Sequence, residues 1–236
     1  MTLTIILAVN DGMIFATDSR GTIGDPRGLT AQNDTIKKQY KITDKAVLQM
    51  SGANETGTLV IEEIENWCKS QQTQPNVTTI MNQLRFILRN RYNDWFSSIP
   101  PFQMNPNQPQ RPSLVVSLGG YEDINGISTE RIYAMPSPMD FAPQLFKTGI
   151  AISGIPQYAI YLTLRLYSRD MPLEAAKRLA AYVITETATQ DGKVGGPIQM
   201  MELKPNSSIR EINEEELKQI SEQNETVNLK LKKLFR

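Results

Sequence analysis

Hydrophobic residues in this chain follow two different periods, and the period changes several times along its length. Short apolar or alternating runs, bounded by glycine, proline, asparagine or aspartate, are typical of β-strands. Two of the clearest, TLTIILAV and MIFATDS, flank Asn10-Asp11-Gly12, a sequence that favours a tight hairpin. On this pattern we predict strands over residues 2–9, 13–19, 36–42, 46–52, 113–122, 130–136, 144–154 and 195–204.

Other segments have apolar residues three or four positions apart, which indicates one buried face of an α-helix. In ETGTLVIEEIENWCKSQQ, for example, Leu59, Ile64 and Cys68 fall near one face and acidic residues on the other. The same period predicts helices over 55–72, 77–96, 155–168, 172–190 and about 213–235. Groups of strands thus alternate with pairs of helices, which indicates an α+β fold with helix layers over sheets rather than βαβ units.

Two polar segments interrupt these elements. Residues 20–35 are polar and contain glycine, and we predict a loop there. Residues 97–112 hold five of the fourteen prolines, which excludes regular structure. They could link two domains, but the strand expected at 113–122 has no obvious core partners of its own. We therefore predict a single domain over 1–236, with a long surface loop at 97–112 and a peripheral C-terminal helix.

One lysine is unusual within the strand predicted at 36–42. Alternation places Lys38 on the same face as Tyr40 and Ile42 and directs the residues between them to water. A lysine among apolar side chains is costly unless a carboxylate pairs with it. Asp18, at the end of the second predicted strand, is the natural partner. Taken alone, its motif ATDSRG favours an ordinary strand-end ion pair in a turn.

The charge balance argues against some classes of partner. The chain has 25 basic and 25 acidic residues, so it offers no electrostatic reason to bind nucleic acid or an anionic membrane. The apolar run 2–9 is too short to cross a bilayer, and it lacks the preceding basic residues of a signal peptide. We therefore expect an intracellular, cytoplasmic protein.

Two residue types are scarce, and their scarcity restricts the chemistry. The chain has no histidine, which excludes Ser–His–Asp and Cys–His sites and histidine-ligated metals. The single cysteine, Cys68, can form neither an intrachain disulfide nor a thiolate cluster, and we expect it to be a buried, inert thiol. Hydrolysis would need a carboxylate, a lysine, a tyrosine or a terminal amine as its base. We expect no metal and no cofactor.

Several short motifs, taken in order, resemble those of proteasome β-type subunits. A strand that starts at a threonine is followed by ATDSRG, TIKKQYKI, MSGANETG, LVVSLGGYED, AISGI and TQDGKVGGPIQMMEL. Together they cover about residues 2–203 and resemble a bacterial proteasome-like homologue. The resemblance implies an N-terminal nucleophile hydrolase: a four-layer αββα sandwich of two antiparallel sheets between helix layers. It also implies a threonine-type endopeptidase of peptides or unfolded proteins, assembled in homo-oligomeric rings.

The resemblance also implies a set of site residues. Thr2 would be the nucleophile, with its own α-amine as general base. The other catalytic positions are Asp18, Lys38, Gly52, Ser153 and Asp191. Lys38 would lower the pKa of the amine, Asp18 would orient Lys38, and the N–H of Gly52 would stabilise an oxyanion. Ser153 and Asp191 would surround the amine. The implied substrate pocket, suited to large apolar side chains, is lined by Gly21, Ile36, Tyr40 and Met50.

Two features depart from that pattern. Val194 stands where the family usually has a serine, so a proton relay around the amine would lack one member. Met1 precedes Thr2, and the mechanism requires its removal, which is common before a small residue. Two alternatives therefore stay open: a non-catalytic structural ring subunit of the same fold, and an amide hydrolase acting on a small metabolite. Any dependence on ATP would require an ATPase partner, because the chain has no nucleotide-binding motif.

Overall fold

Two five-stranded sheets form the centre of the molecule. The computed structural model describes residues 2–24, 30–100, 110–154 and 156–234. The first sheet has the strand order β10-β1-β2-β11-β12, the second has β5-β6-β7-β8-β9, and β3 with β4 forms a separate hairpin. The strands are β1 Leu3–Val9, β2 Gly12–Thr17, β3 Gly21–Gly24, β4 Thr30–Asn33, β5 Gln39–Thr43, β6 Ala46–Gly52, β7 Leu114–Ile124, β8 Ile127–Pro136, β9 Gln144–Leu145, β10 Ile150–Gly154, β11 Gln199–Leu203 and β12 Arg210–Glu211. Neighbouring strands in the described residues pair antiparallel.

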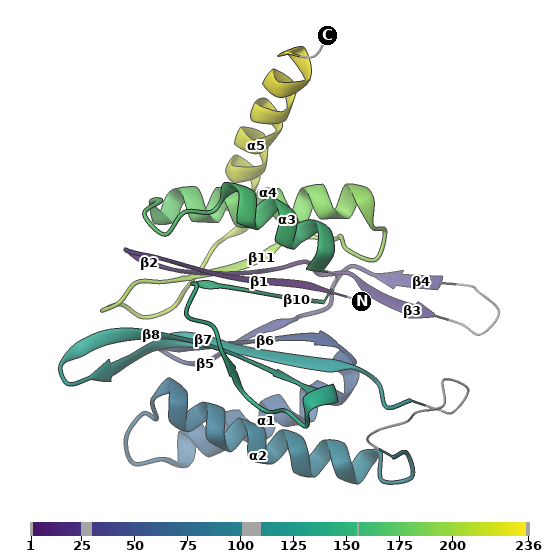
Figure 1. Ribbon diagram of the computed structural model, residues 1–236, viewed down its shortest axis with the longest axis vertical. Helices are drawn as coiled ribbons and strands as arrows, with labels where there is room; N and C mark the ends of the chain where they lie inside the picture. The colour runs from purple at the N-terminus through teal and green to yellow at the C-terminus, as the bar shows by residue number, and fades with distance from the viewer. Residues whose placement is uncertain (1, 25–29, 101–109, 155, 235–236) are drawn as a thin grey trace.

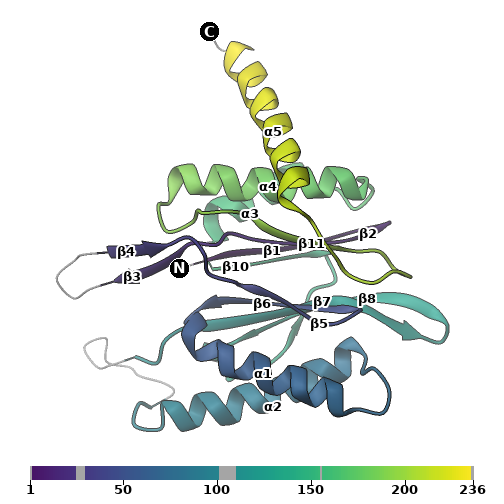
Figure 2. The same cartoon turned by 180° about the vertical axis from the view of Figure 1, so that it is seen from behind.

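Helices cover the outer face of each sheet. They are α1 Asn54–Ser70, α2 Val77–Trp95, α3 Pro156–Leu166, α4 Leu173–Gln190 and α5 Glu214–Leu234, with a short 3₁₀ turn at Ser137–Met139. Figure 1 shows α3 and α4 beside the first sheet, and α1 and α2 on the far side of the second sheet. The view from behind shows the same order (Figure 2). The predicted α+β class is therefore confirmed.

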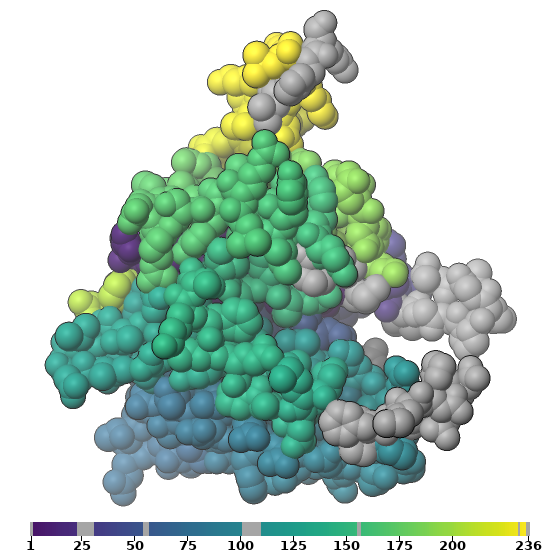
Figure 3. All heavy atoms as spheres, in the orientation of Figure 1, coloured from purple at the N-terminus to yellow at the C-terminus, as the bar shows by residue number. Residues whose placement is uncertain are grey.

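The last helix differs from the other four in its surroundings. Its first half packs on the body of the molecule through Leu217 and Ile220. Asn224 and Asn228 donate hydrogen bonds to Arg178 and Glu186 of α4, and the end of the helix beyond them projects away from the stacked layers (Figure 3). None of the helices within the described residues combines the length and apolar character needed to cross a bilayer.

The space between the two sheets is divided into an apolar and a polar half. Side chains such as Phe15, Val47 and Met201 form an apolar cluster at one end. At the other end the buried side chains are polar and bond from sheet to sheet. The Nε2 of Gln49 in β6, for example, donates to the carbonyl oxygens of Ile5 and Ala16, each at 3.3 Å. Hydrogen bonds of this kind, which buried polar groups require, join the two sheets in this half of the interior.

The hairpin predicted at the start of the chain is confirmed. Strands β1 and β2 pair from Thr4 opposite Thr17 to Val9 opposite Gly12, with the turn at Asn10 and Asp11 between them. Both strands are buried along their whole length, because the first sheet has a helix layer on one face and the second sheet on the other. The hairpin therefore places the start of β1 beside the end of β2.

Four predicted elements are wrong in extent. The loop expected at 20–35 contains strands β3 and β4. The strand expected at 144–154 is two strands in different sheets, separated by a bend at Gly149, whose φ is +80°. The strands expected from residues 36 and 195 begin only at β5 and β11, respectively. Residues 101–109, the middle of the predicted proline-rich loop, lie outside the described residues.

Candidate active site

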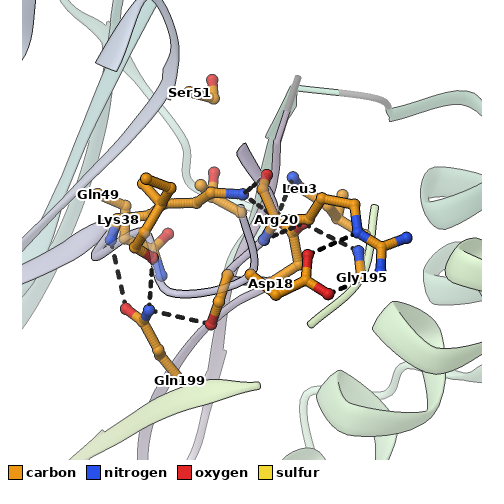
Figure 4. A network of polar contacts seen from close by, with 12 residues as sticks. Leu3, Asp18, Arg20, Lys38, Gln49, Ser51, Gly195 and Gln199 are labelled. Atoms are coloured by element: carbon orange, nitrogen blue, oxygen red, sulfur yellow. Dashed lines mark hydrogen bonds and ion pairs between the residues drawn. The ribbon is translucent and has the colours of Figure 1, made fainter. Parts of the chain in front are cut away.

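A buried carboxylate, that of Asp18, organises the polar half of the interior. Asp18 follows β2 directly and is fully buried. Its Oδ1 accepts hydrogen bonds from the backbone N–H of Leu3 at 2.9 Å and from Nζ of Lys38 at 2.7 Å. Its Oδ2 accepts from the backbone N–H groups of Arg20 at 3.2 Å and Gly195 at 3.1 Å. Four donors therefore converge on one carboxylate (Figure 4).

Lys38 supplies the matching cation. Its side chain is also fully buried, and Nζ donates to the carbonyl oxygen of Arg20 at 2.7 Å as well as to Asp18. The predicted ion pair of Lys38 with Asp18 is therefore confirmed. Burial lowers the pKa of Lys38, and the nearby Asp18 carboxylate opposes that decrease. Removing two charges from water is tolerated here because both groups have several hydrogen-bond partners.

The predicted reason for the burial of Lys38 is wrong. Residues 36–38 lie before β5, so strand alternation does not govern them. Tyr40 and Ile42 pack toward the core formed with α1 and α2, whereas Lys38 points to the first sheet. Gln39, expected to face water, is buried between the sheets, where its Oε1 accepts from Gln49 at 3.2 Å. The cation lies where the chain crosses from one sheet to the other.

Thr2 lies immediately before β1, next to the residue whose N–H binds Asp18. It is only 2% exposed. Gly154 of β10 pairs with Leu3, and any Cβ at Gly154 would clash with the carbonyl oxygen of Thr2. Gly154 also has a φ of +101°, which favours glycine. The backbone at Thr2 is therefore closely fitted between β10 and the Asp18 network.

A second, outer ion pair supports the inner one. The guanidinium of Arg20 binds Asp34 in a bidentate fashion, with Nε–Oδ1 and Nη2–Oδ2 distances of 2.8 Å each. The hydrogen bond to Asp34 raises the pKa of Arg20, and the bond to Arg20 lowers the pKa of Asp34. The carbonyl oxygen of Arg20 accepts a hydrogen bond from Nζ of Lys38. The Arg20–Asp34 ion pair therefore holds in place one of the two acceptors of the Lys38 ammonium.

The two residues expected around the Thr2 amine have other partners in this structure. The hydroxyl of Ser153 lies 2.6 Å from that of Thr4 and accepts from Ser51 at 3.1 Å. The Oδ1 of Asp191 accepts from the N–H of Lys193 at 2.9 Å, in the turn after α4. Their roles around the amine stay predictions.

Gly52 and Val194 occupy distinct settings. Gly52 ends β6 with a φ of +99°, and it is exposed, so its backbone can be approached from solvent. A side chain there would clash with the carbonyl oxygen of Ser113.

Val194, in contrast, is fully buried in the core beside α4. Valine therefore stands in an apolar environment at the position where a serine was expected.

The four residues expected to line a substrate pocket are partly brought together. Gly21 lies against Ile36, since a Cβ at Gly21 would come 2.8 Å from Cγ1 of Ile36. Tyr40 is half-buried, and its hydroxyl donates to the carbonyl of Lys37 at 3.0 Å. Met50 is fully buried in the core with α1. Gly21 and Ile36 are thus adjacent, while Met50 contributes chiefly to the core.

Sequence analysis missed several residues that build the site. Gly195 contributes the fourth donor to Asp18, and Gln199 binds the segment that carries Lys38. The only sequence signal for Gln199 was a polar residue within the strand predicted at 195–204. Among the described residues, no group of three or more histidine, cysteine, aspartate or glutamate side chains is arranged to hold a metal ion.

Comparison with known proteins gives matches to solved structures only. No protein-family model matches the chain, and no curated protein matches it. Anbu (ancestral beta-subunit) from Yersinia bercovieri is similar with a TM-score of 0.74 and 18% identity, over 99% of this chain and 96% of the other. The Anbu (Gly-1) mutant from Hyphomicrobium sp. strain MC1 gives a TM-score of 0.71 and 19% identity, over 100% and 97%.

This chain has the Anbu fold. The match extends over nearly the whole length of both partners, and at such low identity it establishes the fold and not the activity. It also corrects the expected assignment to proteasome β-type subunits. The similar structures are Anbu proteins, which are proteasome-like but distinct, and no family model supports the β-type assignment. The expectation rested on motifs of a few residues each, and such short patterns do not separate related groups of proteins.

Proposed function

We propose that the chain is an N-terminal nucleophile hydrolase in which processed Thr2 attacks an amide carbonyl. One observation carries the proposal: a single oxygen of Asp18 binds both the N–H of Leu3 and the ammonium of Lys38. This arrangement holds a buried positive charge beside the start of β1, adjacent to Thr2. Buried charges with perturbed pKa values gather at functional sites.

The chemistry follows from the groups present. The hydroxyl of Thr2 adds to the substrate carbonyl while the α-amine of Thr2 accepts its proton. The backbone N–H of Gly52, at an exposed glycine, is available to stabilise the oxyanion. The intermediate then collapses to an acyl ester on Thr2, and the ammonium returns its proton to the departing amine. Water, deprotonated by the same α-amine, hydrolyses the ester and restores the hydroxyl.

The α-amine is a suitable base because of its neighbour. An unperturbed terminal amine has a pKa of about 7.7–8.0, and a nearby ammonium lowers it by repulsion of like charges. Lys38 supplies that ammonium, and Asp18 keeps it in place. General-base catalysis is most effective when the pKa of the base is near the working pH. The mechanism requires a free amine on Thr2, and hence a chain without Met1.

The substrate class we propose is a peptide, cleaved internally. We propose that Gly21, Ile36 and Tyr40 contact an apolar side chain of the substrate, because Gly21 lies against Ile36 and the ring of Tyr40 is half-buried. We further propose that the layers seen in Figure 1 are the four-layer αββα sandwich of N-terminal nucleophile hydrolases. Assembly in homo-oligomeric rings and a cytoplasmic location belong to the same proposal. They await measurement of the particle mass and of the location in cells.

A second candidate function is a non-catalytic relative of the same fold. Val194 favours it, because a buried valine cannot exchange protons at the position where a serine was expected. The retained network of Asp18 and Lys38 opposes it. The two candidates differ in one measurable property, which is turnover that depends on the hydroxyl of Thr2.

The test uses protein shown by intact mass spectrometry to lack Met1. Thr2→Ala should abolish hydrolysis of fluorogenic peptides with apolar residues before the cleaved bond. Thr163→Ala is the matched control, since Thr163 is an equally buried threonine on α3, away from the site. Full turnover by the Thr2 variant would refute the proposal. Absence of turnover in every Met1-free preparation, over a broad peptide panel, would favour the non-catalytic candidate.

A further inference from the structure

The segment that carries Lys38 lacks the support of a sheet. Residues 36–38 precede β5, and their backbone crosses the space between the two sheets. The N–H of Ile36 donates to the carbonyl of Ser19 at 3.1 Å, and the carbonyl of Lys38 accepts from the N–H of Met50 at 2.9 Å. Two further backbone groups of this segment, the carbonyl of Ile36 and the N–H of Lys38, need partners from elsewhere.

One carboxamide serves both groups. The Nε2 of Gln199 donates to the carbonyl of Ile36 at 2.7 Å, and its Oε1 accepts from the N–H of Lys38 at 3.3 Å. The same Nε2 also donates to the hydroxyl of Ser19 at 3.1 Å. Gln199 thus replaces the missing strand partner on both sides of Lys37, and Figure 4 shows it reaching Lys38 from the side of β11.

The position of Gln199 connects two parts of the site. It begins β11 in the first sheet and lies opposite Thr17, the residue before Asp18. Through Ser19 it contacts the residue after Asp18. Because Gln199 is held in the first sheet, it fixes the backbone of Lys38 relative to the backbone that carries Asp18.

We propose that Gln199 is a positioning residue of the candidate active site, whose carboxamide holds the Lys38 ammonium at its working distance from the Thr2 amine. This inference rests on the proposed function, because it concerns the amine that serves there as base. Other residues of the site hold Nζ of Lys38, whereas Gln199 holds its backbone. The charged groups that face this ammonium are Asp18, Arg20 and Asp34.

The proposal predicts a specific change in the Thr2 amine. Gln199→Met keeps a side chain of similar length but removes both hydrogen-bonding groups. Lys38 should then move away from the amine, so repulsion weakens and the pKa of the amine rises toward its ordinary value. The acidic limb of the kcat/KM profile should move to higher pH. Because small misplacements of catalytic groups are costly, kcat should fall about 10- to 100-fold while KM changes little.

A second variant covers the case in which Gln199→Met does not fold. Gln199→Glu retains the size and the acceptor for Lys38, but its carboxylate cannot donate to Ile36. It also adds a negative charge near the site, so the pKa of the Thr2 amine should rise here too. Gln49→Met is the matched control. It removes another buried carboxamide between the sheets, one whose hydrogen bonds go to Ile5, Ala16 and Gln39 rather than to residues 36–38.

The experiment measures the pKa of the Thr2 amine by NMR in Met1-free protein, together with the pH profile of peptide hydrolysis. We expect both Gln199 variants to raise that pKa and Gln49→Met to leave it unchanged. A parental amine pKa in the folded Gln199 variants would overturn the inference, and so would an equal shift in Gln49→Met. An active Thr2→Ala variant would instead refute the proposed function. The NMR measurement tests the position of the Lys38 ammonium relative to the Thr2 amine, whether or not turnover is detected.

Discussion

Replacing Lys38 by methionine provides a quantitative test of the buried ion pair. The change keeps most of the side-chain volume but leaves the Asp18 carboxylate without its cation. Breaking a buried pair in this way typically costs about 3–5 kcal/mol. Asp18 would retain three backbone donors, those of Leu3, Arg20 and Gly195. These bonds stabilise the lone carboxylate, so we expect a loss near the lower end, about 3 kcal/mol.

The partner variant should behave differently. Asp18→Asn removes the negative charge that faces the buried Lys38 ammonium, and it sets an amide NH2 against the N–H groups of Arg20 and Gly195, so we expect a larger loss, about 5 kcal/mol. The double variant contains neither charge and should be more stable than Asp18→Asn alone. A double-mutant cycle then gives a coupling of more than about 3 kcal/mol between the two sites.

Urea unfolding followed by far-UV circular dichroism measures these differences. Lys177→Met is a matched control for loss of a buried lysine, because Lys177 pairs with Glu174, Glu202 and Glu216 and not with Asp18. It should be destabilised while hydrolysis by the folded fraction persists, whereas folded Lys38→Met should be inactive. A Lys38→Met variant within about 1 kcal/mol of the parent, or a strictly additive double variant, would refute the proposed energetics of the pair.

Three further predictions concern other parts of the fold. Gly154→Ala should displace Thr2 and cost at least about 1–3 kcal/mol, with loss of turnover; unchanged thermal melting and activity would contradict it. Val194→Ser should lower unfolding stability by about 1–3 kcal/mol, because it buries a hydroxyl in an apolar core. Hydrogen bonds from Arg210 and Lys177 lower the pKa of Glu216 to about 2, so its stabilisation is present above about pH 4.5 and lost as the pH falls toward 2. Glu216→Gln should therefore flatten the pH dependence of the melting temperature in that window, and a parental slope would exclude this contribution.

Local patterns were sufficient for much of the secondary structure. The β1–β2 hairpin was predictable because its turn sequence and its two apolar runs are contiguous. The helices at α1, α2 and α4 were predictable because an apolar stripe that recurs every 3.6 residues is typical of a helix with one buried face. Boundaries were less predictable. The strand expected at 144–154 changes sheets at Gly149, and a single run of letters does not indicate which sheet each half joins.

The candidate site shows the same division between local and distant information. The sequence alone excluded histidine chemistry, and it indicated that Lys38 needs a carboxylate, for which Asp18 was the natural choice. The cost of an unpaired buried charge supplies the physical reason for that inference once Lys38 is taken to be buried. Alternation nevertheless gave the wrong surroundings for Lys38, because residues 36–38 are not part of a strand.

Only the tertiary structure decided what surrounds the ion pair. Gly195 and Gln199 lie more than 150 residues from Asp18 and Lys38 in the chain, yet they bind these two residues directly. Such contacts depend on strand order and register, which bring β11 beside β2. The hydrophobic periodicity of a single segment does not indicate which strands become neighbours. A charged residue within an apolar segment indicates that a partner of opposite charge is needed. The arrangement of the sheets determines where the two paired charges lie.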